Sequence, residues 1–321
     1  MLFRSLFPIV FKSLIINNIT LDCEEYFLFF LLLDDAQRNM KKNNFLFSVA
    51  LFVIVAVLCF AGCKPMPNEG IPFYMKIDSV KLVTNYSVEG NNSQNITDVW
   101  VEANTDNLGA YELPCNFPVL QENDVRFVIS AGIKESGQSG VRVNYPFYEP
   151  DTFTLVATRG NKYSHVPVFK YKAATVFSFN EDFEFGNGFT GMNKIYQPDS
   201  NVHYGSACGM LAVNPTDSNK EADAIQKYAL PAGQEIWMEV DYKSEVPFWV
   251  GFVGRFSSGD VTTYPVLFVT AKDRWNKLYV KFSDAVSSVR ANTYSIYFEG
   301  LNPDGNSGGS VDIDNVKLVH F

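Results

Sequence analysis

Short runs in which apolar and polar residues alternate are the feature that most constrains the fold of this chain. Val125, Phe127 and Ile129 share one side of such a run, and residues 236–242 repeat the pattern. A period of two is typical of a half-buried β-strand, and no window after residue 70 keeps the apolar spacing of an amphipathic helix over three turns. Aromatic residues, which favour strands, make up 15% of the chain. We therefore expect β-strands beyond residue 70.

Turn-forming residues separate these runs at short intervals. Clusters that contain Gly, Asn or Asp stand at 89–92, 106–109 and 159–161. Many short strands joined by such turns indicate a β-sandwich. The runs fall into two groups, 71–175 and 179–321, which we interpret as two domains.

The segment 40–62 has the composition of a signal peptide. Lys41 and Lys42 precede an almost wholly apolar run at 45–60, and two small residues, Ala61 and Gly62, close it. Positive region, apolar region and small residues in this order are the marks of an exported precursor. The apolar run is shorter than the roughly 20 residues that a membrane-spanning helix needs. The alternative is an uncleaved anchor helix.

The four residues 60–63, Phe-Ala-Gly-Cys, resemble the lipobox of bacterial lipoproteins. In that family the chain is cut before the cysteine, whose thiol then carries a diacylglycerol. The resemblance implies that Cys63 is the lipid attachment site, and that the chain contacts the membrane through this anchor. Phe60 stands where the family usually has Leu.

The residues on either side of this segment extend the interpretation. Residues 63–70 are polar and Pro-rich, as expected of a short tether. Lys64 follows the cysteine, where the lipoprotein family uses Asp for retention at the inner membrane. We therefore expect an outer-membrane lipoprotein, with exposure at the cell surface as one option.

Met40 is a natural start, so we interpret residues 1–39 as an upstream extension assigned in error; the alternative is a genuine extra segment.

The net charge argues against one class of function, and the cysteine content bears on whether a disulfide forms. The formal net charge is -9, which argues against a nucleic-acid binder that follows phosphates. Beyond Cys63 only Cys115 and Cys208 remain, one in each expected domain. We favour two small buried apolar side chains over a disulfide across the domain boundary.

The first domain carries a hairpin pattern. The pattern consists of a strand at 96–101, a turn, and a returning strand that ends at Pro114. The domain, residues 71–175, resembles the small Ig-like modules at the start of many exported lipoproteins. The resemblance implies an Ig-like β-sandwich.

The second domain contains four short motifs in a recognisable order. They stand at 182–186 (Asp-Phe-Glu-Phe-Gly), 203–206 (His-Tyr-Gly-Ser), 275–282 (beginning with Trp275) and 313–316 (Ile-Asp-Asn-Val). Residues 180–321 thereby resemble the jelly-roll carbohydrate-binding modules and their galactose-binding-like relatives. The expected fold class is thus all-β, with an Ig-like sandwich followed by a jelly-roll sandwich over 179–321, preceded by a signal-peptide helix.

This resemblance also implies a cofactor. In the jelly-roll family an opening Glu and a closing Asp often meet on one edge and bind a structural calcium ion. The matching residues are Glu184 and Asp314. Ca²⁺ takes six to eight oxygen ligands, typically carboxylates and carbonyls. The alternative is that both acids are simply solvated at strand ends.

Aromatic residues are the candidates for a sugar site. Flat rings stack on the apolar face of a sugar, and nearby amides and acids bind its hydroxyl groups. Trp237 shares a strand face with Glu239 and Asp241, so we expect it to be the most exposed tryptophan; the alternative is a core position. Trp249 is the second aromatic candidate.

The motifs of catalysis are missing from the sequence. There is no His-Glu-x-x-His pattern and no Gly-rich phosphate loop after a strand, and the Gly-Asn-Ser-Gly-Gly run at 305–309 is typical of a flexible loop before the last strand. We therefore predict a lipid-anchored, non-enzymatic envelope protein that binds a glycan, with other envelope proteins as further candidate partners. One alternative is a structural or adhesive protein that contacts other proteins, and a weaker one is a glycoside hydrolase with two paired acids.

Overall fold

The computed structural model describes residues 70–321, apart from 198–200, 304 and 306–307. Residues Gly70–Phe321 form one compact unit. The predicted upstream extension at 1–39, the signal peptide at 40–62, the lipid attachment site Cys63 and the tether up to residue 69 lie outside the described residues.

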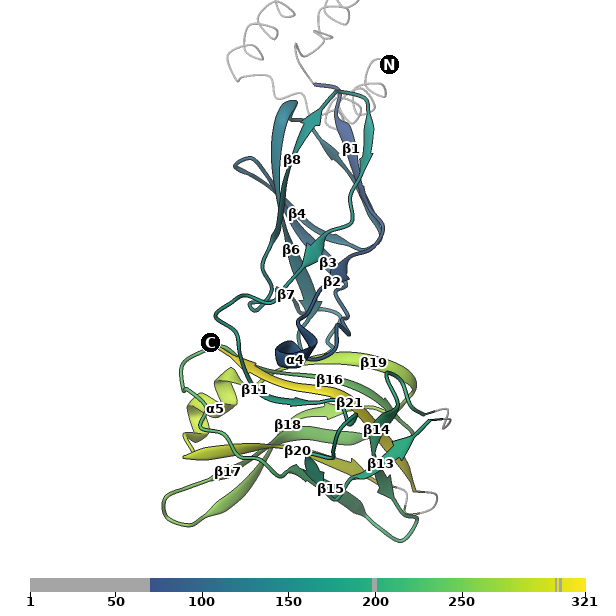
Figure 1. Ribbon diagram of the computed structural model, residues 1–321, viewed down its shortest axis with the longest axis vertical. Helices are drawn as coiled ribbons and strands as arrows, with labels where there is room; N and C mark the ends of the chain where they lie inside the picture. Colours follow the sequence, from purple (N-terminus) through teal and green to yellow (C-terminus); the bar gives the residue numbers. More distant parts are fainter. Residues whose placement is uncertain (1–69, 198–200, 304, 306–307) are drawn as a thin grey trace, which may run out of the picture. The chain divides into compact units, whose positions relative to one another are not determined.

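Strands make up most of the described chain, and the expected all-β fold is confirmed (Figure 1). Its helices within the described ranges are α4 (Tyr86–Glu89) and α5 (Ser283–Val289). In this part of the chain, no helix has the length and apolar character needed to cross a membrane.

Residues 70–175, here called the N-terminal region, contain three sheets. The first has the strand order β5-β1-β9, the second pairs β2 with β10, and the third has the order β4-β3-β6-β7, with β8 also pairing β6. The strands are β1 (Phe73–Ile77), β2 (Lys81–Leu82), β3 (Asp98–Ala103), β4 (Asp106–Glu112), β5 (Cys115–Val119), β6 (Asn123–Lys134), β7 (Arg142–Asn144), β8 (Asp151–Ala157), β9 (Lys162–Ser164) and β10 (Val168–Phe169).

Period-two alternation builds the core of the N-terminal region. In β1 the side chains of Phe73, Met75 and Ile77 are buried, whereas Tyr74 and Lys76 between them are exposed. The predicted run at Val125–Ile129 lies in β6 and buries its three apolar residues in the same core. This alternation places one face of each strand against the facing sheet.

Residues 176–321, here called the C-terminal sandwich, form two sheets. A six-stranded sheet has the order β13-β14-β21-β16-β19, with β11 also pairing β21, and a five-stranded sheet has the order β12-β15-β20-β17-β18 (Figure 1). The strands are β11 (Val176–Glu181), β12 (Phe189–Thr190), β13 (Asn193–Tyr196), β14 (Ala207–Val213), β15 (Asn219–Ala224), β16 (Ile236–Ser244), β17 (Phe248–Arg255), β18 (Val261–Val269), β19 (Lys272–Lys281), β20 (Thr293–Leu301) and β21 (Gly309–His320).

The core of the C-terminal sandwich lies between its two sheets. Met238 and Val240 of β16 are buried in the same cluster as Phe248, Val250 and Phe252 of β17. Because neighbouring residues on a strand point to opposite faces, the residues between these positions face away from the core. The sandwich therefore presents two outer faces, one on each sheet.

The edge strand β18 contains an irregularity that shapes the five-stranded sheet. Val250 pairs with Leu267 but Gly251 pairs with Pro265, so one residue of β18 is bulged out. A Cβ atom at position 251 would lie 2.1 Å from the carbonyl oxygen of Tyr264, so this position requires glycine. Pro265 is tolerated because an edge strand does not need every backbone N–H for pairing.

The two predicted domains share part of their packing. No named strand of the N-terminal region pairs with a named strand of the C-terminal sandwich among the described residues. However, the apolar core of the N-terminal region includes Trp237, Tyr279 and Val319 of the C-terminal sandwich. The division into domains at 71–175 and 179–321 stays a prediction.

Candidate functional site

The sequence-predicted ligand residues lie on two different faces of the C-terminal sandwich. Trp237, Glu239 and Asp241 belong to β16 and point outward from the six-stranded sheet, on what we call the junction face. Trp249 belongs to β17 and points outward from the five-stranded sheet, on what we call the open face. The structure therefore does not bring the four residues together.

Trp237 is buried, and the expectation that it is the most exposed tryptophan is wrong. Its side chain is 2% exposed and belongs to the core of the N-terminal region. The ring meets Tyr145 edge to face, with 5.5 Å between centroids, and its Nε1 donates to Glu235 at 2.7 Å. Alternation correctly indicates that Trp237 points away from its own sandwich, but the N-terminal region covers this surface.

Glu239 and Asp241 are also buried, so the sugar site predicted around them is corrected to an internal polar network. Glu239 Oε1 accepts hydrogen bonds from the hydroxyl groups of Tyr145 and Tyr171, both at 2.8 Å. The Nζ of Lys277 lies 3.2 Å from Glu239 Oε2 and 3.7 Å from Asp241 Oδ1. The lysine thus lies at ion-pair distance from both acids beneath the N-terminal region.

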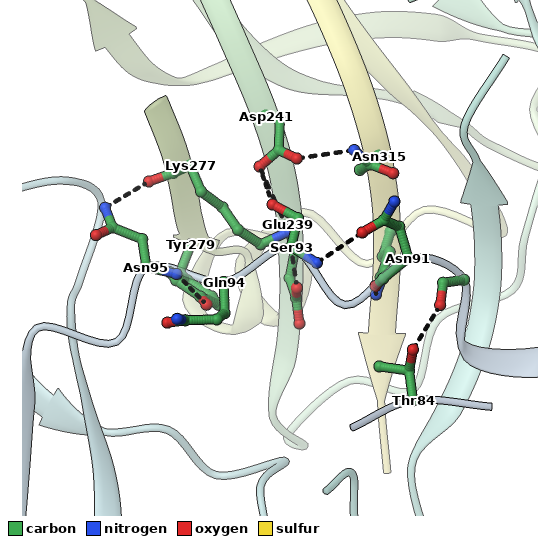
Figure 2. A network of polar contacts seen from close by, with 12 residues as sticks. Thr84, Asn91, Ser93, Gln94, Asn95, Glu239, Asp241, Lys277, Tyr279 and Asn315 are labelled. Atoms are coloured by element: carbon green, nitrogen blue, oxygen red, sulfur yellow. Dashed lines mark hydrogen bonds and ion pairs between the residues drawn. The ribbon is translucent and has the colours of Figure 1, made fainter. Parts of the chain in front are cut away.

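A loop of the N-terminal region completes this network (Figure 2). The Ser93 hydroxyl donates to Asp241 Oδ1 at 2.8 Å, and the Asn315 amide donates to Asp241 Oδ2 at 2.8 Å. The Asn95 amide donates to the backbone carbonyl of Lys277 at 3.1 Å. The junction face is therefore joined to residues 93–95 by hydrogen bonds as well as by apolar packing.

The electrostatics of the junction face follow from its burial. Burial alone would raise the pKa of Glu239, but Lys277, Lys317 and the two tyrosine hydroxyl groups hold it below its ordinary value. Burial works to lower the pKa of Lys277, yet Asp241 and Glu239 hold it above its ordinary value. Burial lowers the pKa of Lys317 to about 8, although its Nζ donates to the carbonyl of Asn91 at 2.6 Å. Such a paired, desolvated network suits structural cohesion better than ligand exchange.

The open face carries a row of four residues in register across four strands. Glu221 of β15 pairs with Glu299 of β20, Glu299 pairs with Trp249 of β17, and Trp249 pairs with Phe268 of β18. Neighbouring strands lie about 4.8 Å apart, so the row crosses about 14 Å. We call these four residues the open-face row.

The aromatic end of the open-face row is accessible. Trp249 is half-buried and Phe268 is 45% exposed. Their ring centroids lie 5.2 Å apart, with 64° between the ring planes. Because the two rings come from neighbouring strands in a fixed register, they form an apolar platform on the sheet surface.

The polar end of the row is organised by neighbouring side chains. The Asn219 amide donates to Glu299 Oε1. Burial raises the pKa of the Tyr297 hydroxyl, and the adjacent Glu299 and Glu221 raise it further. The Tyr297 hydroxyl therefore stays protonated, and the two carboxylates offer acceptor oxygens beside the aromatic platform.

A charge pair borders this polar end. Arg255 Nη2 lies 2.8 Å from Asp223 Oδ2, and its Nη1 donates to the Ser295 hydroxyl at 2.7 Å. Asp223 also accepts from the Ser295 hydroxyl. Asp223 and Arg255 are thus occupied with each other, which leaves the two glutamates of the row as the acids available to a ligand.

Alternation could have identified Trp249 as outward-facing, but not its neighbours. Glu221 and Glu299 are far apart in sequence and meet only through the pairing of β15 with β20. Phe268 reaches Trp249 through a register that the bulge at Val250/Gly251 shifts by one residue. The sequence shows that these strands contain aromatic and acidic residues, but it does not show how those residues are placed relative to one another.

The candidate calcium ligands occupy unequal surroundings. Both oxygens of Glu184 are engaged, because Oε1 accepts from the backbone N–H of Ser206 at 2.8 Å and Oε2 accepts from the Ser206 hydroxyl at 2.6 Å. Asp314 is 1% exposed, and burial raises its pKa to about 8. In the described ranges, no group of three or more His, Cys, Asp or Glu side chains is arranged to hold a metal ion. Calcium binding at Glu184 and Asp314 stays a prediction of the resemblance.

Comparison with known proteins gives matches among solved structures alone. No protein-family model and no curated protein matches the chain. The CBM22-1 xylan-binding domain from Paenibacillus barcinonensis is similar at 15% identity, over 46% of this chain and 97% of that domain, with a TM-score of 0.34. The family 11 carbohydrate-binding module of a cellulosomal cellulase of Clostridium thermocellum is similar at 19% identity, over 46% of this chain and 95% of that module, with a TM-score of 0.31.

A third similar structure is an adhesin domain. The K3 cleaved adhesin domain of Lys-gingipain from Porphyromonas gingivalis shares 14% identity over 46% of this chain and 99% of that domain, with a TM-score of 0.31. Several of the similar solved structures are thus carbohydrate-binding modules with jelly-roll folds.

Proposed function

We propose that this protein binds a glycan on the open face of its C-terminal sandwich, without converting it. The observation that carries the proposal is the open-face row, in which two accessible rings stand in register with two carboxylates on four adjacent strands. Trp249 and Phe268 supply the platform, and Glu221 and Glu299 supply the acceptors. This assignment replaces the predicted site around Trp237.

The chemistry of a sugar ring matches this arrangement. A pyranose has a face of C–H groups, which packs on an aromatic ring, and a rim of hydroxyl groups, which donate to carboxylates and amides. A binding site typically combines an apolar surface with a few placed polar groups of this kind. The open-face row provides both within one line of side chains.

The burial of the junction face supports the same assignment. Trp237, Glu239 and Asp241 are engaged by the N-terminal region, so a ligand would reach them only if the apolar core and the polar network separated. The open face needs no such rearrangement. We therefore assign ligand contact to the open face and a supporting role to the N-terminal region.

A glycan array tests the proposal. Because Gly70–Phe321 is one compact unit, the chain from Lys64 to Phe321 serves as the soluble protein. We expect binding to at least one neutral polysaccharide, and a loss of about tenfold or more with Trp249→Ala, as for a central aromatic anchor. Phe185→Ala is the matched control, because Phe185 is 92% exposed and lies outside the open-face row.

Two results would contradict the proposal. If the protein binds no glycan on the array, the structural or adhesive alternative becomes the better one. If Trp249→Ala binds as tightly as the unmodified protein, a glycan site elsewhere on the chain is indicated. The non-catalytic part is checked by incubating the bound polysaccharide with protein and measuring new reducing ends, whose appearance would favour a glycoside hydrolase.

The anchor and the calcium ion remain parts of the proposal. For the anchor, we expect labelled fatty acid to be incorporated by the precursor and not by Cys63→Ala, with Cys208→Ala retaining the label. For calcium, we expect a higher Tm with calcium than with chelator, and no such difference in Asp314→Asn. A Tm that calcium leaves unchanged in the unmodified protein would remove the ion from the proposal.

A further inference from the structure

The five strands behind the open face carry few charges, and their signs are unequal. The acids are Glu221 and Asp223 on β15 and Glu299 on β20, and the outward-facing base is Arg255 on β17. Lys220 alternates with Glu221 and so points to the opposite face. β12 and β18 carry no charged residue. Three carboxylates against one guanidinium give the open face a formal charge of -2.

The single base is not available to neutralise the open-face row. Arg255 is bound to Asp223 and Ser295. Within the described ranges, Glu221 and Glu299 have no Lys, Arg or His partner at ion-pair distance. The uncompensated negative charge is therefore located on the two glutamates, which stand in register with Trp249.

We propose that the open face selects neutral glycans and rejects acidic ones, with Glu221 and Glu299 as the residues that determine this specificity. This inference rests on the proposed function of the same face. A sugar stacked on Trp249 lies one strand away from Glu299 and two from Glu221, at spacings of about 5 and 10 Å. A neutral hydroxyl group donates to these carboxylates, whereas a uronate or a sulfate ester is repelled by them.

The surroundings hold the two glutamates in this role. Asn219 donates to Glu299, and both Glu299 and Glu221 raise the pKa of the Tyr297 hydroxyl beyond the effect of its burial. A neutral amide and a protonated phenol orient carboxylates without cancelling their charge. Carboxylates without a cation partner act mainly by repelling an acidic ligand. Many binding sites discriminate in this way, by disfavouring the wrong ligand.

Matched polysaccharide pairs test the inference. The pairs are hydroxyethyl cellulose with carboxymethyl cellulose, neutral arabinoxylan with glucuronoxylan, and dextran with carboxymethyl dextran. We expect the protein to bind the neutral member of at least one pair about tenfold more tightly than its acidic partner at low salt. The preference should shrink in 1 M salt, where the Debye length is about 3 Å.

The double variant Glu221→Gln/Glu299→Gln isolates the two charges. We expect its preference for the neutral member to fall toward unity, chiefly because it gains affinity for the acidic member. Glu102→Gln/Asp124→Asn is the matched control, since it removes the same charge from exposed positions of the N-terminal region and should keep the preference. Circular dichroism verifies that both variants are folded.

The possible outcomes separate the two proposals. Equal affinity of the unmodified protein for both members of a pair, or a preference that the double variant retains, overturns the charge inference and leaves glycan binding intact. Binding to no member of any pair, by the unmodified protein and the double variant alike, overturns glycan binding on this face and the inference with it.

Discussion

The two outer faces of the C-terminal sandwich present the same kinds of residue and differ in what covers them. On the junction face Trp237 lies on one strand with Glu239 and Asp241, and all three are buried. On the open face Trp249 stands in register with two glutamates and beside Phe268, which is 45% exposed. Residue type alone therefore does not distinguish a binding surface from an internal one.

The acids on the two faces have different partners. A buried carboxylate costs several kcal/mol unless it is paired and hydrogen-bonded. Glu239 accordingly has Lys277 and two tyrosine hydroxyl groups around it, whereas Glu299 has a neutral asparagine and no cation at ion-pair distance in the described ranges. Glu221 is exposed and Glu299 is half-buried, so water can solvate both acids without a lysine.

Removal of Lys277 gives the largest expected effect and tests the junction side of the comparison. Lys277→Ala leaves Glu239 buried without its ion-pair partner, which should lower the free energy of unfolding by about 3–5 kcal/mol. Lys272→Ala is the control, because Lys272 is exposed on the same strand and should change stability by less than about 0.5 kcal/mol. Urea denaturation measures both; similar stabilities for the two variants would contradict a desolvated ion pair.

The two tryptophans provide a crossed test. Trp237→Ala removes a fully packed ring and should lower the free energy of unfolding by about 3–5 kcal/mol, while the folded protein keeps its glycan affinity. Trp249→Ala should show the reverse, with a smaller stability loss and most of the affinity lost. Urea denaturation and affinity electrophoresis on the same samples decide. A Trp237→Ala variant that is stable but no longer binds would reverse the assignment of the two faces.

Lys317 makes the junction sensitive to alkaline pH. Its pKa falls from an ordinary 10.5 to about 8 on burial, so between these values the unfolded chain binds a proton that the folded chain does not. Stability from this group therefore rises with pH from about 8 toward 10.5 and is lost as pH falls through about 8. Between pH 7 and 9.5 the gain should be about 1–2 kcal/mol relative to Lys317→Met. Parallel curves for the two proteins would contradict the shift.

Alternation along a strand indicates which of its residues share a face. The pairing of the strands determines which of these residues come together in a site. The pattern around Trp237 correctly indicates that its ring points away from its own core, and the same alternation applied to Trp249 gives the same result. It could not show that the N-terminal region covers one of them, because that contact joins residues such as Ser93 and Asp241, which are 148 positions apart. Likewise, Glu221 and Glu299 become neighbours only through the register of β15 and β20. The all-β fold can be predicted from local patterns alone, whereas the prediction of a site requires the long-range contacts.

The smallest expected effect concerns the stability of the open face. Glu299→Gln keeps the hydrogen bond from Asn219 possible and removes a charge that has no cation partner in the described ranges, so the free energy of unfolding should change by less than about 0.5 kcal/mol. Glu239→Gln, the same change on the junction face, leaves Lys277 buried without its closest acid and should cost about 3 kcal/mol or more. Urea denaturation of the two variants measures the effect of the same substitution on the two faces. Equal losses would mean that the open-face row contributes to folding as the junction does, and that its acids are not free to meet a ligand.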